Sequence, residues 1–212
     1  MVPILYEDEW VLVCLKPPGL LAQDGPAGSL PALLRDQLGG EIYPVHRLDR
    51  EAGGVMVYAR TQRAAASLSA AIQRQELEKV YLCVTRGVPA APEGVYTDLL
   101  LHDKVRNKSF VVRRPRGGVK EASLSYQVLD RREERALVRV TLHTGRTHQI
   151  RVQFASRGTP LSGDRKYGGG SGPLALWSAR LSFPHPRTGA LMTFIRLPQG
   201  EPWESFRLPE SL

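Results

Sequence analysis

The sequence is strand-rich and contains two or three helical stretches, a pattern compatible with the α+β fold class. Its 212 residues can bury a sizeable core as one large domain or as two closely packed subdomains. Hydrophobic residues make up 42% and charged residues 24%, which is ordinary for a soluble globular protein. No apolar run is long enough to cross a bilayer, and the early acidic residues do not fit a signal peptide. We therefore expect a cytoplasmic protein that does not bind membranes.

The first part of the chain alternates strands and helices. Strands are expected over three apolar runs, at residues 10–15, 55–59 and 79–85. Leucines at helical spacing predict a helix over residues 30–38, which Gly39 and Gly40 end. Thr61 is expected to N-cap a second helix that runs to about Lys79.

The second part is predicted to be mostly strands. They are expected at residues 109–112, 122–129, 136–142, 181–183 and 191–197. Residues 130–135 are expected to form a charged turn, and Thr147 can N-cap a short helix. Two arginines and two histidines within residues 143–151 suit binding of an anion or a carboxylate. On this stretch alone, a capped helix with exposed basic residues fits equally well.

The charge of the chain points to an anionic partner. The formal net charge is +8, with a pI of about 9.8. Residues 102–120 hold seven basic side chains and one acid, in a pattern that resembles a basic hairpin more than a disordered tail. Nucleic acid is the leading partner. A membrane surface is a distant second, because the sequence contains no amphipathic basic helix.

Several features argue against a metal or a nucleotide cofactor. Cys14 and Cys83 lie inside apolar runs without a CxxC pattern, which indicates a structural role. The glycine-rich segment 158–172 fits neither GxxxxGK[ST] nor a GxGxxG between strand and helix. Lys16, at the end of a strand, could meet a phosphate, but the sequence alone favours a solvated side chain.

The most unusual stretch places Asp49 between Arg47 and Arg50 and leads into Gly53-Gly54. A carboxylate flanked by fixed cations stays ionised at neutral pH, which suits it to act as a nucleophile or a base. A surface turn with a solvated ion pair is the commoner explanation of such a pattern. This stretch alone therefore does not decide between a reactive carboxylate and a surface ion pair.

Six ordered stretches across nearly the whole chain carry a resemblance to one family, the RluA-type RNA pseudouridine synthases. They are Lys16-Pro17 with Gly19, His46-Arg47-Leu48-Asp49 with Gly54, Lys79 with Tyr81, residues 144–152 (TGRTHQIRV), Gly163-Asp164 with Tyr167-Gly168, and residues 181–186 (LSFPHP). The resemblance implies a single catalytic domain over residues 1–212, an α+β fold. Its mixed, mainly antiparallel sheet would lie in two halves flanked by helices, with a central cleft that carries Asp49.

The resemblance also implies the reaction, the isomerisation of a uridine in structured rRNA or tRNA to its C5-glycoside without cofactor or metal. Asp49 would be the catalytic residue, and Arg151 would pair with it. Tyr81 would pack against the target base, Leu176 would add an apolar base contact, and Arg47 would meet the RNA. The base must leave its stack, and an aromatic side chain can replace the lost stacking. We expect a monomer.

The chain departs from the family pattern at two places. Ala52-Gly53 stands where the family usually has Thr-Ser, and Trp177 stands where a histidine is common. These departures bear on substrate geometry and efficiency rather than on the reaction class. Because the catalytic motifs begin almost at residue 1, no N-terminal domain of the S4 type is expected, and RNA choice would come from this domain.

Other functions remain possible at this stage. A catalytically silent RNA-binding or RNA-chaperone protein on the same fold gains support from Ala52-Gly53 and loses more from the presence of Asp49, Tyr81 and Arg151. A two-carboxylate glycosidase needs a second acid, and Glu51 is too close in sequence to face Asp49 across a substrate. A zinc deaminase fails for want of a CxxC motif.

Overall fold

The computed structural model describes residues 1–25 and 28–212, which form two compact units. The first unit comprises Met1–Lys79 and Trp177–Leu197, and the second comprises Val80–Leu176 and Pro198–Leu212. Both units contain a sheet and at least one helix, as expected for the α+β class.

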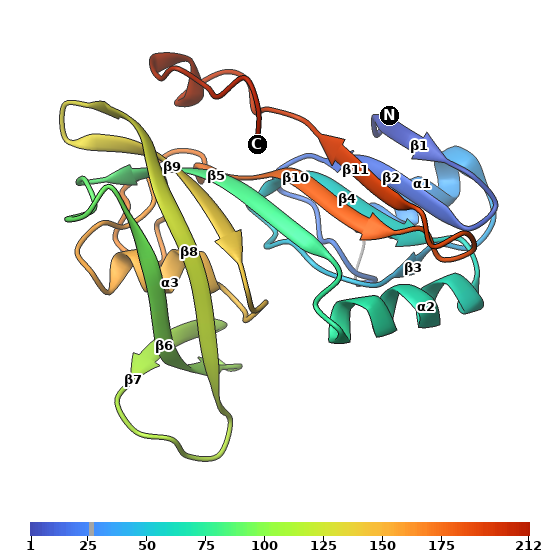
Figure 1. The fold of residues 1–212 in the computed structure, drawn as a ribbon, viewed down its shortest axis with the longest axis horizontal. Helices are drawn as coiled ribbons and strands as arrows, with labels where there is room; N and C mark the ends of the chain where they lie inside the picture. Colours follow the sequence, from blue (N-terminus) through green and yellow to red (C-terminus); the bar gives the residue numbers. More distant parts are fainter. Residues whose placement is uncertain (26–27) are drawn as a thin grey trace. The chain divides into compact units, whose positions relative to one another are not determined.

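The first unit is built on a mixed sheet (Figure 1). Its strands follow the order β1 (Ile4–Glu7), β2 (Val11–Lys16), β4 (Gly53–Ala59), β10 (Leu176–Pro184) and β11 (Leu191–Ile195), with the short β3 (Tyr43–Pro44) beside β4. These pairs are antiparallel except β4 and β10, which run parallel through Gly53 opposite Trp177 and Gly54 opposite Ser178. The mixed character predicted for the sheet is therefore confirmed.

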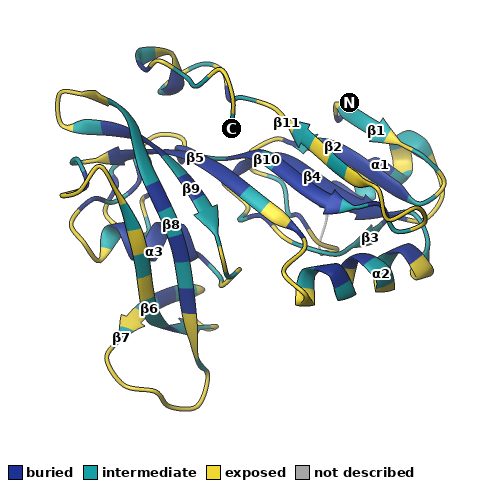
Figure 2. Cartoon of the chain, in the orientation of Figure 1, coloured by how far each residue is buried: buried dark blue, intermediate teal, exposed yellow. Residues whose placement is uncertain are grey.

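Strand β4 lies at the centre of the first unit. All of its residues are buried, which Figure 2 shows as a continuous dark blue strand. A strand covered on both faces is expected to be continuously apolar, as Val55–Ala59 is. The helix α2 (Gln62–Gln73) packs along β3 and β4 and contributes Ala64 and Leu68 to the core.

The helices of the first unit follow their sequence signals closely at three of their four ends. Helix α1 (Leu30–Leu38) has the predicted bounds and ends at Gly39, whose φ is 71°. Thr61 caps α2 as predicted, by accepting a hydrogen bond from the Ala64 N–H at 3.1 Å. The predicted end of α2 near Lys79 is wrong. Gln75 adopts a left-handed φ of 62°, which stops the helix and turns the chain so that Leu77 enters the core.

The second unit contains an antiparallel sheet. Its strands follow the order β5 (Glu78–Arg86), β9 (Arg135–Leu142), β8 (Val119–Arg132), β6 (Glu93–Asp103) and β7 (Lys108–Val112), with Glu78 and Lys79 of β5 assigned to the first unit. The hairpin of β6 and β7 confirms the predicted basic hairpin. Strand β6 was not predicted, because exposed and half-buried residues alternate over residues 93–98 and its apolar run, residues 99–101, is only three residues long.

A short helix, α3 (Gln149–Ala155), packs against β6 and β7. The prediction that Thr147 caps it is wrong. His148 occupies the cap position in a left-handed conformation, with φ of 54° and no side-chain cap bond. The residues from Gln149 to Phe154 are all buried, so this helix is embedded in the unit rather than laid on its surface. A single turn of 3₁₀ helix, η1 (Trp203–Ser205), lies near the C-terminus.

Within the described parts of the chain, no helix is both long and apolar enough to cross a membrane.

Candidate functional site

Asp49 lies in a tight turn between β3 and β4. The Ala52 N–H donates to the Asp49 carbonyl at 3.1 Å and closes the turn. Leu48 and Ala52 are buried, with 6% and 1% of their surface exposed, whereas Asp49 is half-buried and Arg47 and Arg50 are exposed. The turn is thus anchored on both sides of Asp49, which is itself half-buried.

Lys16 supports this turn from inside the first unit. Its side chain has no exposed surface, and Nζ donates to the carbonyls of Ala52 at 2.6 Å, Arg50 at 3.0 Å and Pro17 at 3.1 Å. Burial lowers the pKa of the ammonium to about 8, while the nearby Asp49 and Glu51 carboxylates act in the opposite direction. The interpretation of Lys16 as a solvated side chain is therefore wrong.

A second connection joins the Lys16-Pro17 region to the same turn. Gly19 N–H donates to the Arg50 carbonyl at 2.7 Å, and Arg50 Nε donates to the Gly19 carbonyl at 2.9 Å. The segment from Lys16 to Gly19 therefore fixes the backbone that carries Asp49.

His46 is a neutral, structural histidine in this arrangement. Its Nε2 accepts a hydrogen bond from the Val57 N–H at 3.1 Å, which places the ring proton on Nδ1. Although the residue keeps some exposed surface, Nδ1 itself is buried and has no partner among the described residues. Burial, followed by the positive charge of Lys79, lowers the His46 pKa to about 3.

The two departures from the family pattern meet in the first unit. A Cβ added at Gly53 would lie 2.5 Å from Trp177 Cζ3, and one added at Gly54 would lie 2.3 Å from the Ser178 carbonyl oxygen. Gly54 also has a φ of 119°, which L side chains rarely adopt. Directly after the Asp49 turn, the chain is therefore restricted to glycine.

Arg151 lies in the second unit and is held by Asp164. Arg151 Nε and Nη2 donate to the two Asp164 oxygens at 2.7 and 2.8 Å, and the two side chains are 4% and 0% exposed. These bonds use two of the five N–H donors of the guanidinium, in a bidentate geometry that fixes its plane. The alternative that this stretch exposes its basic residues is wrong for Arg151.

Asp164 is itself fixed by the glycine-rich loop. Its Oδ1 accepts the N–H groups of Lys166 at 3.2 Å and Tyr167 at 3.3 Å. The Tyr167 ring lies 5.3 Å from the Arg151 guanidinium, and its hydroxyl accepts the Ser109 N–H at 2.7 Å. The loop, which the sequence left without a role, therefore orients Arg151 and also attaches to β7.

The segment before α3 is ordered by its own side chains. Gln149 Oε1 accepts from Thr144 Oγ1 at 2.7 Å and from the Arg146 N–H at 3.0 Å. Gln149 Nε2 donates to the Ser123 carbonyl at 3.0 Å. Arg146 remains exposed. These contacts replace the missing helix cap and fix the approach to Arg151.

Two other predicted substrate-binding residues, Tyr81 and Leu176, also lie in the second unit. Tyr81 is on β5 opposite Val140, and Leu176 begins β10. Both are 5% exposed. Their contacts with a base, and the pairing of Arg151 with Asp49 in the other unit, stay predictions.

Two exposed turns carry most of the local positive charge. The first basic turn, residues 104–107, joins β6 to β7, and the second basic turn, residues 113–118, joins β7 to β8. Figure 2 shows the turn between β7 and β8 as exposed. Both turns present guanidinium or ammonium groups to solvent, as a surface that binds phosphates requires.

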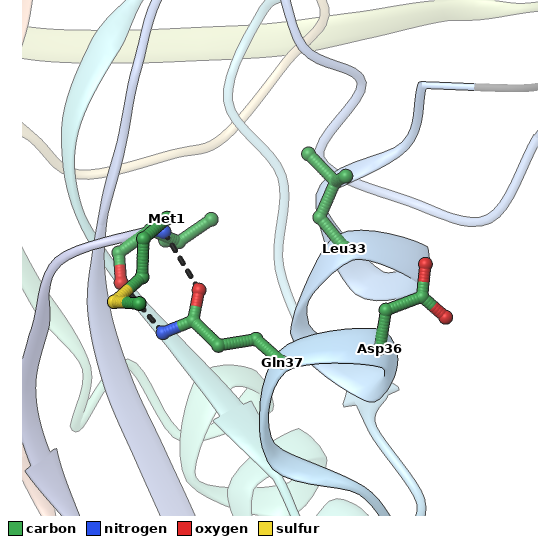
Figure 3. Close-up of a pocket in the computed structure, with 5 residues that line it drawn as sticks. Met1, Leu33, Asp36 and Gln37 are labelled. Carbon is green, nitrogen blue, oxygen red and sulfur yellow. Dashed lines mark hydrogen bonds between the residues drawn. The ribbon is translucent and has the colours of Figure 1, made fainter.

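The pocket in Figure 3 lies elsewhere in the first unit. It is lined by Met1, Val2, Leu33, Asp36 and Gln37. Gln37 closes one side by accepting the Val2 N–H at 2.7 Å and donating to the Val2 carbonyl at 3.0 Å. None of the predicted site residues contributes to it, so it is not a candidate for the reacting centre.

The cysteines show no sign of a chemical role. Cys14 and Cys83 are free and fully buried, and burial raises the pKa of the Cys14 thiol to about 12. Among residues 1–25 and 28–212, no group of three or more His, Cys, Asp or Glu side chains could hold a metal ion.

The fold is similar to that of a solved human protein structure. The solved structure of Human RNA Pseudouridylate Synthase Domain Containing 4 superposes with a TM-score of 0.77 at 26% identity, covering 93% of this chain and 89% of that one. The predicted fold, an α+β protein with a mixed, mainly antiparallel sheet, is confirmed.

The sequence comparisons identify the family. The RNA pseudouridylate synthase family profile matches residues 10–156. An uncharacterized RNA pseudouridine synthase of Aquifex aeolicus is 37% identical over 91% of this chain and 68% of its own length. The ribosomal large subunit pseudouridine synthase D of Pseudomonas aeruginosa is 38% identical over 78% of this chain and 53% of its own length. The chain belongs to the RNA pseudouridine synthase family and spans about half to two thirds of these relatives.

Proposed function

We propose that this protein converts a uridine in RNA to pseudouridine, with Asp49 as the reacting side chain. The observation that carries the proposal is the Asp49 turn, in which a half-buried carboxylate sits on backbone fixed by the three hydrogen bonds of Lys16. A buried ammonium is costly to place in a protein unless its donors are satisfied, as the three carbonyls satisfy those of Lys16. Here it fixes the turn that carries Asp49.

The proposed reaction breaks the bond between N1 of uracil and C1′ of ribose and forms a bond between C5 and C1′. The C5 proton is lost and N1 gains a proton, so the product is an isomer and no oxidant, reductant or metal is needed. Asp49 would serve either as a nucleophile at C1′ or as a base at C2′. Both roles require an ionised and accurately placed carboxylate.

We propose that Arg151 pairs with Asp49 and holds its carboxylate. A guanidinium oriented by Asp164 is suited to this task, because a fixed fork loses little freedom when it meets a second carboxylate. Tyr81 and Leu176 would contact the flipped base, since aromatic and apolar side chains replace lost stacking. Arg47, exposed beside Asp49, would contact the RNA backbone.

The RNA is proposed to be ribosomal. The Pseudomonas aeruginosa relative is described as a synthase of the large ribosomal subunit, and the two basic turns supply cations for a structured, phosphate-rich target. Transfer RNA is the alternative substrate. We further propose that the protein acts in the cytoplasm and as a monomer.

The first prediction tests Asp49. Purified wild type should form pseudouridine in total RNA taken from a strain that lacks this protein, while Asp49→Asn and Asp49→Ala should form none. Asp36→Asn removes an exposed acid on α1 and should leave the activity unchanged. Mass spectrometry of nuclease digests measures the product, and a chemical mapping reaction locates the position.

The opposite outcome supports a different function on the same fold. If wild type forms no pseudouridine in ribosomal or transfer RNA but binds RNA with normal salt dependence, the activity is wrong and a catalytically silent RNA-binding role takes its place.

A further inference from the structure

The indole of Trp177 occupies the space where residue 53 would carry a side chain. A Cβ at Gly53 would lie 2.5 Å from Trp177 Cζ3 and 2.8 Å from Trp177 Cε3, both atoms of the six-membered ring. Gly53 and Trp177 are also paired positions of the parallel strands β4 and β10. The ring therefore lies directly against the backbone of Gly53, at a distance that no other residue at position 53 allows.

The indole is held in this position. Its Nε1–H donates to the Arg196 carbonyl at 2.7 Å, and the residue is half-buried. A Cβ at Gly53 would also lie 3.2 Å from the Lys16 carbonyl oxygen. Gly53 is thus enclosed between the Lys16 backbone on one side and the fixed ring of Trp177 on the other.

The enclosed residue directly follows the Asp49 turn. Ala52 closes that turn through its N–H and is itself 1% exposed, with its carbonyl bonded to Lys16 Nζ at 2.6 Å. Lys16 therefore holds the Ala52 carbonyl, and Trp177 blocks movement of the next residue along the chain. Gly53 has no side chain of its own that could restrict the end of the turn, so the Trp177 ring supplies this restraint.

We propose that Trp177 is a positioning residue for Asp49. Its ring takes the place of the side chain absent at position 53 and so fixes the C-terminal end of the Asp49 turn. The proposal rests on the proposed function only for its catalytic consequence, because the restraint on the turn exists whether or not the protein modifies RNA. It predicts that positions 53 and 177 are energetically coupled: each tolerates a change only if the other changes with it.

The restraint is tested first without any activity measurement. Amide hydrogen exchange is followed in peptides covering residues 47–54 for wild type, Trp177→Ala, Gly53→Ala and the double variant. We expect exchange at least tenfold faster in Trp177→Ala, where the ring is lost, and in Gly53→Ala, where the new methyl displaces it. In the double variant the methyl enters the emptied space, so exchange should return to within about threefold of wild type.

A matched control separates this effect from general loss of stability. Trp10→Ala removes another half-buried indole of the first unit and should change exchange in its own surroundings but not in residues 47–54. If Trp177→Ala proves poorly folded, Trp177→Phe, which keeps an aromatic ring but cannot reach as far, takes its place. Unchanged exchange in residues 47–54 of a folded Trp177 variant overturns the proposal.

The catalytic consequence is tested with the same variants. At saturating RNA, Trp177→Ala and Gly53→Ala should each lower kcat at least tenfold with the RNA Kd within about twofold, and the double variant should recover most of kcat. Single variants with a raised Kd and a normal kcat would overturn the positioning role. A double variant whose loss of kcat equals the product of the two single losses would also overturn it. If wild type itself forms no pseudouridine, the proposed function fails, and the exchange experiment alone decides on the restraint.

Discussion

Two buried charged residues orient the groups expected to act on RNA without acting on it themselves. Lys16 fixes the Asp49 turn through backbone carbonyls, and Asp164 fixes Arg151 through a bidentate ion pair. The two cases differ in how the buried charge is compensated. The three carbonyls and two nearby carboxylates compensate Lys16 incompletely, since its pKa still falls to about 8. Asp164 meets an opposite charge directly, in a bidentate ion pair with Arg151 whose two side chains are almost fully buried.

The second prediction concerns this ion pair. Asp164→Asn keeps the side-chain shape but places an NH₂ group against a guanidinium N–H, and it removes the negative charge that faces Arg151 in this buried pair. Removing one partner of a buried pair costs about 3–5 kcal/mol of folding free energy. We expect a clear loss of stability in urea and a kcat at least tenfold lower, with RNA binding largely kept. Arg151→Ala should likewise lower kcat strongly while RNA binding is largely kept.

The control is a second bidentate pair of the same unit that is more exposed. Asp98 accepts from Arg157 Nη1 at 2.9 Å and from Nη2 at 3.2 Å, with side-chain exposures of 12% and 31%. A partly solvated pair contributes about 1 kcal/mol or less, so Asp98→Asn should cost little stability and no turnover. Equal behaviour of the two variants would show that Asp164 has no special role in orienting Arg151.

At the scale of elements, local signals predicted both ends of α1 and the start of α2 and missed features that depend on distant residues. Thr61 and Gly39 act where the sequence places them, because capping depends on a few adjacent residues. The end of α2 depends on Leu77 reaching the core, and the cap of α3 depends on Gln149 and its contact with β8. Tertiary contacts of this kind override local propensity.

The third prediction concerns the second basic turn. The triple variant Arg113→Gln, Arg114→Gln and Arg116→Gln removes three exposed cations and should weaken RNA binding about tenfold or more at 0.1 M salt. The slope of log Kd against log salt should fall by about 2–3, because fewer counterions are released on binding. At saturating RNA, kcat should stay close to the wild-type value.

A charge-matched triple variant controls for the lower net charge. Arg131→Gln, Arg132→Gln and Arg207→Gln remove the same number of exposed cations from another part of the second unit. This variant should keep the wild-type salt slope. If both triple variants lose RNA affinity equally, RNA binding depends on the overall charge of the protein and the second basic turn is not a specific contact.

For the whole molecule, the sequence predicted the family and the fold class better than it predicted how the residues of the candidate site are supported. The motifs around Asp49 and Arg151 are contiguous and could be read directly. Lys16 was misjudged because its partners Arg50 and Ala52 lie more than thirty residues away, and a single lysine at a strand end gives no sign of burial. Strand β6 was missed because its only apolar run, residues 99–101, is short and the residues before it alternate between exposed and half-buried.

The last prediction concerns the acid stability of the molecule. The pKa of His46 is about 3 in the folded protein, whereas an ordinary histidine, as in the unfolded chain, has a pKa of 6.5. Between pH 6.5 and 3, His46 is therefore protonated in the unfolded chain and neutral in the folded protein. The stability contributed by neutral His46 is complete above pH 6.5 and is lost as the pH falls towards 3. The slope from this one group approaches about 1.4 kcal/mol per pH unit.

His46→Gln tests this directly, because the Gln oxygen can accept the Val57 N–H and does not titrate. Urea unfolding between pH 6.5 and about 4.5 should show a free energy of unfolding that falls more steeply for wild type than for His46→Gln, by roughly 1 kcal/mol per pH unit. His143→Gln, which changes an exposed histidine, should follow the wild-type slope. Parallel curves for wild type and His46→Gln would mean that His46 takes up its proton without unfolding. The neutral ring bonded to Val57 would then not be what holds the start of the Asp49 turn against β4.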